Sequence, residues 1–247
     1  MLRTIWVAFA AVFVTVPLAA SVLLVAIIRS TSPWIDRIMR LWARLIIHAA
    51  GIDLHTENLG VIDPDRRYVL VANHNSYFDI PCVFAAVPQP IRFMAKASLF
   101  KIPIFGWALG RAGFIPIDRK NRRTAVKSFD LAAERIRKGN TIVIFPEEGR
   151  SRERAMRPFQ RGAFLLALKA EQPIVPLAID GTYDVYNPKS RYIRPGRVTV
   201  KAGTLIPTAG LTLRDKERLL TESRAQIQTM LFGSAEGPAP AESAPPE

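Results

Sequence analysis

The chain has 247 residues, of which 49% are hydrophobic and 22% charged, and this composition excludes a long disordered protein. Lys and Arg number 34 against 21 Asp and Glu, so the net charge of +13 indicates a polyanionic partner, either nucleic acid, an anionic membrane surface or a phosphorylated substrate. Cys82 is the single cysteine, which excludes an intramolecular disulfide and a multi-cysteine metal site.

The first expected element is a membrane segment. Residues 5–28 form a run of 24 residues without a charge, which as a helix would reach about 36 Å against about 30 Å for a bilayer core. Pro17 inside the run leaves a re-entrant hairpin open as a second interpretation, and a secretory signal peptide is a third. More arginines follow the run than precede it, so the positive-inside rule predicts a membrane protein whose body lies on the cytoplasmic side.

An amphipathic helix is expected next, over residues 33–50, between a Ser-Pro start signal and a glycine. Its arginines and its apolar residues fall on separate stripes, so it either lies in the lipid interface or packs on the body with its arginines in solvent. We therefore expect an N-terminal membrane anchor with an interfacial helix over 1–51, a globular domain over 52–232, and a disordered tail rich in Pro, Ala and Glu over 233–247.

The body alternates apolar runs rich in β-formers with helical stretches. Strands are expected at 68–72, 92–95, 141–145, 174–179 and 197–201. Helices are expected at 79–87, 98–110, 122–138, 159–170 and 213–231. The alternation predicts an α/β fold with a mixed, largely parallel sheet flanked by helices. Pro176 inside its run predicts an edge strand or a bulge. The apolar stretch 98–110 either lines a path for an apolar ligand, dips into lipid, or is a plain core helix.

A candidate catalytic pair follows the first of these strands, in the block Asn73–Asp79 (NHNSYFD). An aspartate can fix the tautomer of a histidine base and stabilise the imidazolium. On a regular helix, residues five apart point about 140° away from each other, so we expect His74 and Asp79 to straddle a turn between strand and helix. His48 and Asp53 have the same spacing without this context. His74 is therefore the catalytic candidate, with a backbone-capping turn histidine as the alternative.

Two further blocks place arginines after extended segments: Gly113–Arg119 (GFIPIDR) and Phe145–Ser151 (FPEEGRS). The guanidinium groups of Arg119 and Arg150 can each grip a phosphate with two hydrogen bonds, or each can be an ordinary solvated arginine. Residues 118–169 hold 14 Lys or Arg and 6 Asp or Glu, a local net charge of +8. Such a surface beside a membrane anchor suits anionic headgroups.

In this order, the three blocks and Val175–Ile179 (VPLAI) resemble the motifs of the glycerolipid acyltransferase family that includes the 1-acylglycerol-3-phosphate acyltransferases. That family carries N-H-x4-D, G-x-I-x-I-D-R, F-P-E-G-T-R-S and V-P-[VL]-A-I. The likeness covers roughly residues 30–205. The third block departs from the pattern, because Glu148-Gly149 stands where Gly-Thr is commoner.

The resemblance implies transfer of a fatty acyl group from acyl-CoA or acyl carrier protein to the 2-hydroxyl of 1-acyl-glycerol 3-phosphate, giving phosphatidic acid in phospholipid synthesis. His74 would take the proton of the hydroxyl and Asp79 would orient His74. The motifs also imply a substrate-binding set, with a lysine added on charge alone: Arg119, Glu147, Gly149, Arg150 and Lys96.

No cofactor or metal is expected, since the acyl thioester is itself a substrate and the sequence shows no cluster of metal ligands. The sequence also lacks a G-x-S-x-G elbow, which disfavours a serine acyl-enzyme. The expected partners are a lysophospholipid, an acyl thioester, an anionic membrane surface and acyl carrier protein as one possible donor. Another acceptor stays open, either glycerol 3-phosphate or a lyso-aminolipid such as lyso-ornithine lipid, as does a non-enzymatic membrane-binding protein. Nucleic-acid binding is not expected, because no reading motif is present.

Overall fold

The computed structural model of the protein describes residues 1–118 and 122–233. Two parts of the chain named in the sequence analysis lie outside these ranges. Arg119 lies outside the described residues, and so does the expected tail apart from Gly233.

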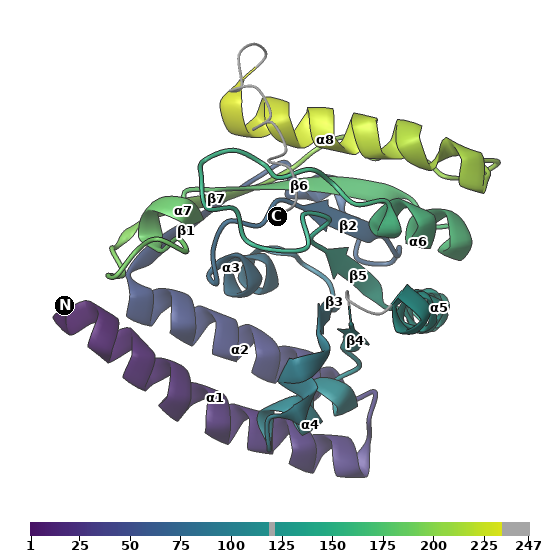
Figure 1. Cartoon of the computed structure of the whole chain (residues 1–247). Helices are drawn as coiled ribbons and strands as arrows, with labels where there is room; N and C mark the ends of the chain where they lie inside the picture. Colours follow the sequence, from purple (N-terminus) through teal and green to yellow (C-terminus); the bar gives the residue numbers. More distant parts are fainter. Residues whose placement is uncertain (119–121, 234–247) are drawn as a thin grey trace.

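A mixed sheet forms the centre of the described part of the chain (Figure 1), with the strand order β1-β7-β6-β2-β5-β3-β4. The strands are β1 (Ile52–Glu57), β2 (Val69–Ala72), β3 (Ile91–Lys96), β4 (Ile115–Ile117), β5 (Thr141–Ile144), β6 (Ile174–Asp180) and β7 (Gly196–Ala202). Neighbouring strands run parallel except for the antiparallel pair β6–β7. The predicted α/β fold with a mixed, largely parallel sheet is therefore confirmed, although β1 was not expected.

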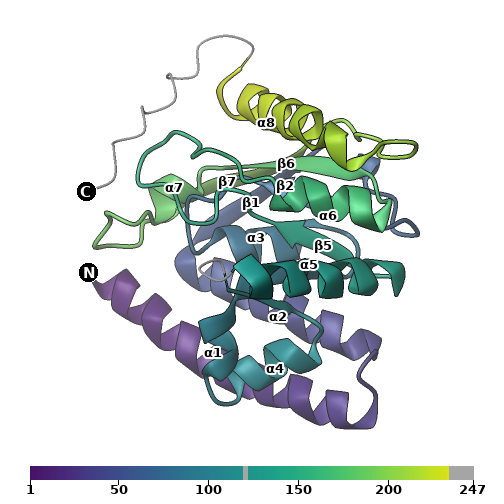
Figure 2. The ribbon, with the colours of Figure 1, turned by 45° about the vertical axis from the view of Figure 1, so that its right-hand side comes forward.

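Helices cover both faces of this sheet (Figures 1 and 2). One face carries α5 (Arg122–Arg137), α6 (Gly162–Ala170) and α8 (Lys216–Phe232). On the other face α3 (Asp79–Ala86) lies against the sheet, α2 (Pro33–Ala50) packs on α3, and α1 (Leu2–Ile28) packs along α2 and α4 (Phe105–Arg111). Short helical turns complete the described chain: η1 (Leu59–Val61), η2 (Ala97–Lys101), α7 (Thr182–Val185) and η3 (Leu213–Asp215).

The strands supply one apolar core on each side of the sheet. Successive side chains of a strand point to opposite faces, so Leu70 and Ala72 of β2 join the core under α2 and α3, whereas Val69 and Val71 join the core under α5, α6 and α8. Both faces of β2 are buried, which explains why its sequence is a continuous apolar run without alternation.

Helix α1 is continuous through Pro17, so a re-entrant hairpin within residues 5–28 is wrong. Instead α1 and α2 together form an antiparallel helical hairpin (Figure 1). Among the described residues, α1 is the one helix that is long and apolar enough to cross a membrane. It is also tied to the body, because Trp42 of α2 donates a hydrogen bond to Thr15 Oγ1 at 2.9 Å and the backbone N–H of Ile193 donates to Thr4 Oγ1 at 2.9 Å.

Helix α2 has the ends that the sequence predicts. Ser32 Oγ accepts a hydrogen bond from the N–H of Trp34, and Gly51 closes the helix at φ 71°, where glycine is favoured. One face of α2 is buried against the body, and Arg40 donates to the carbonyl of Val87 at 2.6 Å. The helix therefore packs on the domain, and its contact with a lipid interface stays a prediction.

Two differences from the expected elements lie at prolines. The stretch 98–110 is not one helix: η2 ends before Pro103, which disfavours helical geometry in the residue before it, and α4 begins after Ile104 at φ 62°. Pro176 lies in an interior strand, so the edge position was wrong. It occupies an irregular stretch between the Ile174–Ile206 bridge and the regular β6–β7 pairing, where its carbonyl accepts from Gly203.

Candidate active site

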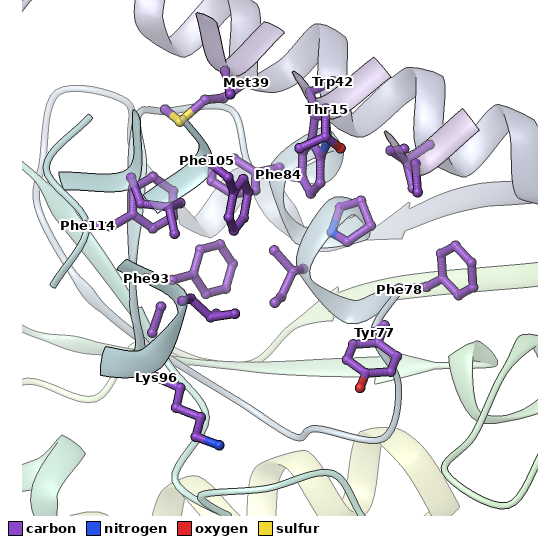
Figure 3. A pocket seen from close by; sticks show the side chains of 18 of the residues that line it. Thr15, Met39, Trp42, Tyr77, Phe78, Phe84, Phe93, Lys96, Phe105 and Phe114 are labelled. Carbon is purple, nitrogen blue, oxygen red and sulfur yellow. The ribbon is translucent and has the colours of Figure 1, made fainter. Parts of the chain in front are cut away.

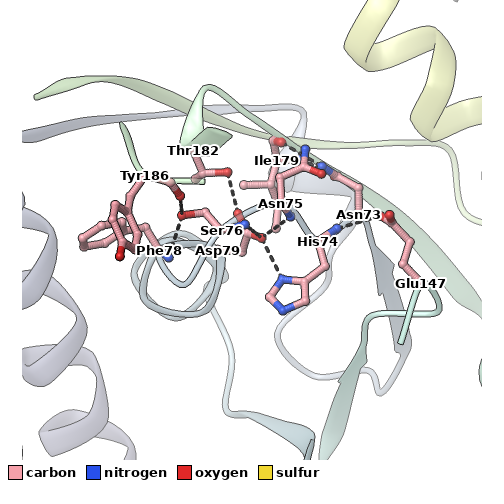
Figure 4. A network of polar contacts seen from close by, with 10 residues as sticks. All are labelled: Asn73, His74, Asn75, Ser76, Phe78, Asp79, Glu147, Ile179, Thr182 and Tyr186. Atoms are coloured by element: carbon pink, nitrogen blue, oxygen red, sulfur yellow. Dashed lines mark hydrogen bonds and ion pairs between the residues drawn. The ribbon is translucent and has the colours of Figure 1, made fainter. Parts of the chain in front are cut away.

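His74 and Asp79 meet across a turn at the carboxyl end of β2 (Figure 4). His74 Nδ1 lies 2.8 Å from Asp79 Oδ2. The same carboxylate oxygen accepts the backbone N–H groups of Asn75 at 2.7 Å and Ser76 at 2.8 Å. With the carboxylate oxygen as the acceptor, Nδ1 is the donor of this hydrogen bond, and in the neutral imidazole Nε2 is then the nitrogen that can accept a proton. The predicted strand–turn–helix geometry of this pair is therefore present.

The turn is held from the neighbouring strands. The Asn73 side chain donates to the Ile179 carbonyl at 2.9 Å and accepts from the Ile179 N–H at 2.7 Å, which joins the end of β2 to β6. The His74 imidazole stacks on the Phe145 ring with a centroid distance of 4.1 Å. Val175–Ile179 thus has a structural task, because β6 supplies the backbone that fixes the loop carrying His74.

Glu147 lies behind this loop and is 2% exposed. Its two carboxylate oxygens accept the backbone N–H groups of His74 and Arg157, each at 2.8 Å. Burial raises the pKa of Glu147 to about 7, although the two N–H groups act in the opposite direction. The side chain therefore connects two loops, which fits an organising role better than that of a second base.

The raised pKa of Glu147 gives a stability prediction for Glu147→Gln. Below pH 4.5 this carboxyl is protonated in both the folded and the unfolded chain. As the pH rises towards 7 the unfolded chain ionises first, so this group lowers the free energy of unfolding over that window by up to about 3 kcal/mol. The wild type should therefore lose stability relative to Glu147→Gln between pH 4.5 and 7, as measured by urea unfolding at several pH values.

Glu134→Gln serves as a control with the opposite sign. Its exposed carboxylate has a pKa lowered by Lys138, so its contribution is lost as the pH falls below about 4.5. A stability difference for Glu147→Gln that does not change between pH 4.5 and 7 would contradict the raised pKa.

The turn after β5 holds Glu148 and Gly149, the two residues at which the third motif differs from the family pattern. Glu148 adopts φ 56°, a left-handed conformation that glycine, the commoner residue there, adopts freely. A Cβ added to Gly149 would lie 2.7 Å from Nη1 of Arg157, so the missing side chain makes room for that guanidinium. The next residue, Arg150, places its guanidinium 3.5 Å from the centroid of the Tyr77 ring.

A cavity of about 950 Å³ extends from this site between the sheet and helices α1 to α4. His74, Gly149 and Arg150 line this cavity, and most of its other lining residues are aliphatic or aromatic. Figure 3 shows the aromatic lining: Trp42, Phe84, Phe93, Phe105 and Phe114. Lys96 also lines the cavity, but its side chain extends away from these rings (Figure 3).

The structure brings most of the expected site residues together at the carboxyl ends of β2 and β5: His74, Asp79, Glu147, Gly149 and Arg150. Lys96 follows β3 on the same cavity, and the position of Arg119 is not described. The second His-x4-Asp spacing forms no such pair, because Asp53 contacts His55 at 2.8 Å on the surface. Sequence reasoning missed Tyr77 and Thr182 as parts of the site, although Gly181-Thr182 follows the fourth motif after a single intervening residue.

Comparison with known proteins shows the family of this chain. The family model described as Acyltransferase matches residues 53–180. A 1-acyl-sn-glycerol-3-phosphate acyltransferase of Chlamydomonas reinhardtii is 33% identical over 184 residues, which cover 72% of this chain and 54% of that protein. The 1-acyl-sn-glycerol-3-phosphate acyltransferase alpha of Mus musculus is 32% identical over 197 residues, 78% of this chain and 69% of the relative. The chain therefore belongs to the acyltransferase family, and it spans about half the length of the algal relative.

A solved structure has the same fold. The crystal structure of the 1-acyl-sn-glycerophosphate (LPA) acyltransferase PlsC from Thermotoga maritima superposes with a TM-score of 0.75, covering 90% of this chain and 92% of that chain at 24% identity. Because nearly the whole chain superposes, the similarity extends beyond the 53–180 segment to the surrounding helices.

Proposed function

We propose that the protein transfers a fatty acyl group from a thioester donor to the 2-hydroxyl of 1-acyl-glycerol 3-phosphate, forming phosphatidic acid. The observation that carries this proposal is that His74, backed by Asp79, opens onto a large apolar cavity beside an arginine. The two relatives are named as 1-acyl-sn-glycerol-3-phosphate acyltransferases, which supports the choice of acceptor.

The proposed reaction uses one base. His74 Nε2 takes the proton of the acceptor hydroxyl while the oxygen attacks the thioester carbonyl, and Asp79 stabilises the imidazolium that forms. When the tetrahedral intermediate collapses, the carbon–sulfur bond breaks and the imidazolium returns the proton to the leaving thiolate. Gly149 and Arg150 line the same cavity, so their backbone N–H groups are the candidates for stabilising the oxyanion.

The two ends of the site suit the two ends of an acyl glycerolipid. The apolar cavity can take an alkyl chain, and burial of each CH₂ group is worth about 0.8 kcal/mol. Arg150, held against Tyr77, presents a planar guanidinium that can bind phosphate with two hydrogen bonds. We further propose that the exposed apolar face of α1, which includes Trp6, Phe9 and Phe13, contacts the membrane from the cytoplasmic side.

A direct assay tests the proposal. Purified protein is given acyl-CoA or acyl carrier protein as donor and a panel of acceptors, and the products are identified by mass spectrometry. We expect phosphatidic acid from 1-acyl-glycerol 3-phosphate to form fastest. A clear preference for glycerol 3-phosphate or lyso-ornithine lipid would replace this acceptor, and no acyl transfer to any of them would favour a non-enzymatic membrane protein.

Substituting Arg150 tests how the phosphate is held. Arg150→Lys keeps the charge and removes the planar pair of donors, so kcat/KM for 1-acyl-glycerol 3-phosphate should fall roughly 10- to 100-fold, as for one lost charged hydrogen bond. An acyl-carrier-protein donor avoids the phosphates of the coenzyme A nucleotide. Arg66→Lys is the matched control, because Arg66 is exposed on the loop before β2, at the other end of that strand. Equal kinetics for both variants would remove Arg150 from the acceptor site.

A further inference from the structure

Asp79 has a second buried partner besides His74. Thr182 Oγ1 donates a hydrogen bond to Asp79 Oδ1 at 2.5 Å, and both side chains are 0% exposed (Figure 4). The two oxygens of the carboxylate thus have different tasks. Oδ2 accepts hydrogen bonds from His74 Nδ1 and from two backbone N–H groups. Oδ1 accepts the hydrogen bond from the Thr182 hydroxyl.

The backbone around Thr182 fixes the position of its hydroxyl. It begins the short helix α7 immediately after β6, and Gly181 before it turns the chain at φ 92°. A Cβ on Gly181 would lie 2.2 Å from the Arg197 carbonyl oxygen, so the turn requires glycine on two grounds. The paired hydrogen bonds between Asn73 and Ile179 hold the start of the His74 loop to the same strand. The hydroxyl and the carboxylate are therefore fixed on two elements that are locked together.

We infer that Thr182 is a positioning residue, which acts on His74 through Asp79; this rests on the proposed role of His74 as the base. The terminal torsion of an aspartate is broad, so hydrogen bonds decide how its carboxylate plane lies. Thr182 holds Oδ1 and thereby leaves Oδ2 aimed at His74 Nδ1. Without the hydroxyl, Oδ1 would be a buried acceptor lacking this partner, and a rotation of the carboxylate would misalign the imidazole.

Thr182→Val removes the hydroxyl and keeps the shape, and Thr182→Ser keeps the hydroxyl and removes the methyl group. We expect Thr182→Val to lower kcat roughly 10- to 100-fold with little change in the KM of the acceptor, because the defect lies in the base and not in binding. Thr182→Ser should recover kcat to within about threefold. Thr208→Val is the matched control, since the buried hydroxyl of Thr208 has no hydrogen-bond partner within the described residues, and its kcat should not change.

A double-mutant cycle separates positioning from a general loss of structure. If Thr182 acts through Asp79, then adding Thr182→Val to Asp79→Ala should cause no further loss of kcat. Full kcat in Thr182→Val, no recovery in Thr182→Ser, or additive losses in the cycle would each overturn the inference. The role of His74 as the base is tested separately. It would be contradicted if His74→Ala remained active, independently of the results for the Thr182 variants.

Discussion

His74→Ala should lower kcat for acyl transfer by about 10²- to 10⁴-fold, the usual contribution of a positioned base. Asp79→Asn should also fall strongly, because an amide can donate a hydrogen bond where the carboxylate only accepts, and the wrong imidazole tautomer is then favoured. Both variants should still bind membranes, since neither residue lies on the exposed face of α1. The measurement is initial velocity with a saturating thioester donor, together with vesicle flotation.

The chain carries its own control for this experiment. His55 and Asp53 form another His–Asp contact of 2.8 Å, but it lies on β1 with the histidine side chain 43% exposed, away from the cavity. His55→Ala and Asp53→Asn should retain most activity, and so should His48→Ala. Similar losses for the surface pair and for His74 with Asp79 would contradict the assignment of the site.

Removing residues 1–29 should lower turnover by about 100-fold or more, even in detergent micelles where no membrane attachment is needed. Helix α1 provides one wall of the cavity, and its buried side chains share a core with α2 and α3. Loss of this wall would leave an acyl chain poorly placed, and a misplacement of about 1 Å can cost 10²-fold in rate. The truncated protein should also unfold at a lower temperature in a thermal melt.

A variant of the exposed face of α1 separates the role of this helix as a wall of the cavity from its role as a membrane anchor. Trp6, Phe9 and Phe13 point away from the body and are exposed. Their joint replacement by serine should weaken flotation with vesicles and leave turnover in micelles close to that of the wild type. Normal turnover of the truncated chain in micelles would make α1 an anchor alone, and an inactive serine variant would show that the two roles cannot be divided.

Sequence patterns predicted the elements that depend on neighbouring residues alone, such as buried apolar strands and capped helix ends. The buried strands β2 and β5 are short apolar runs, and Ser32 with Gly51 marked both ends of α2 correctly. The edge strand β1 was missed because its residues are largely exposed and its register comes from pairing with β7, about 140 residues later. A continuous α1 was left undecided because the effect of Pro17 depends on what packs around it.

The same limit applies to the candidate site. The spacing of His74 and Asp79 was enough to predict a pair across a turn, since both residues belong to one loop. Thr182 lies 103 positions after Asp79, and only the parallel pairing of β2 with β6 brings the two together. The raised pKa of Glu147 likewise follows from its burial between two loops, which no local pattern records.

The two faces of α1 affect how such an enzyme would receive a lipid substrate. The helix presents bulky apolar side chains outward and closes the cavity with its other face, so the surface that would adsorb to lipid is one helix diameter, about 10 Å, from the space proposed for the acyl chain. An acceptor dissolved in the leaflet would then reach the site by lateral diffusion. The effective substrate concentration would be a mole fraction in two dimensions, and added inert lipid would slow turnover although the total amount of acceptor in the sample stayed constant.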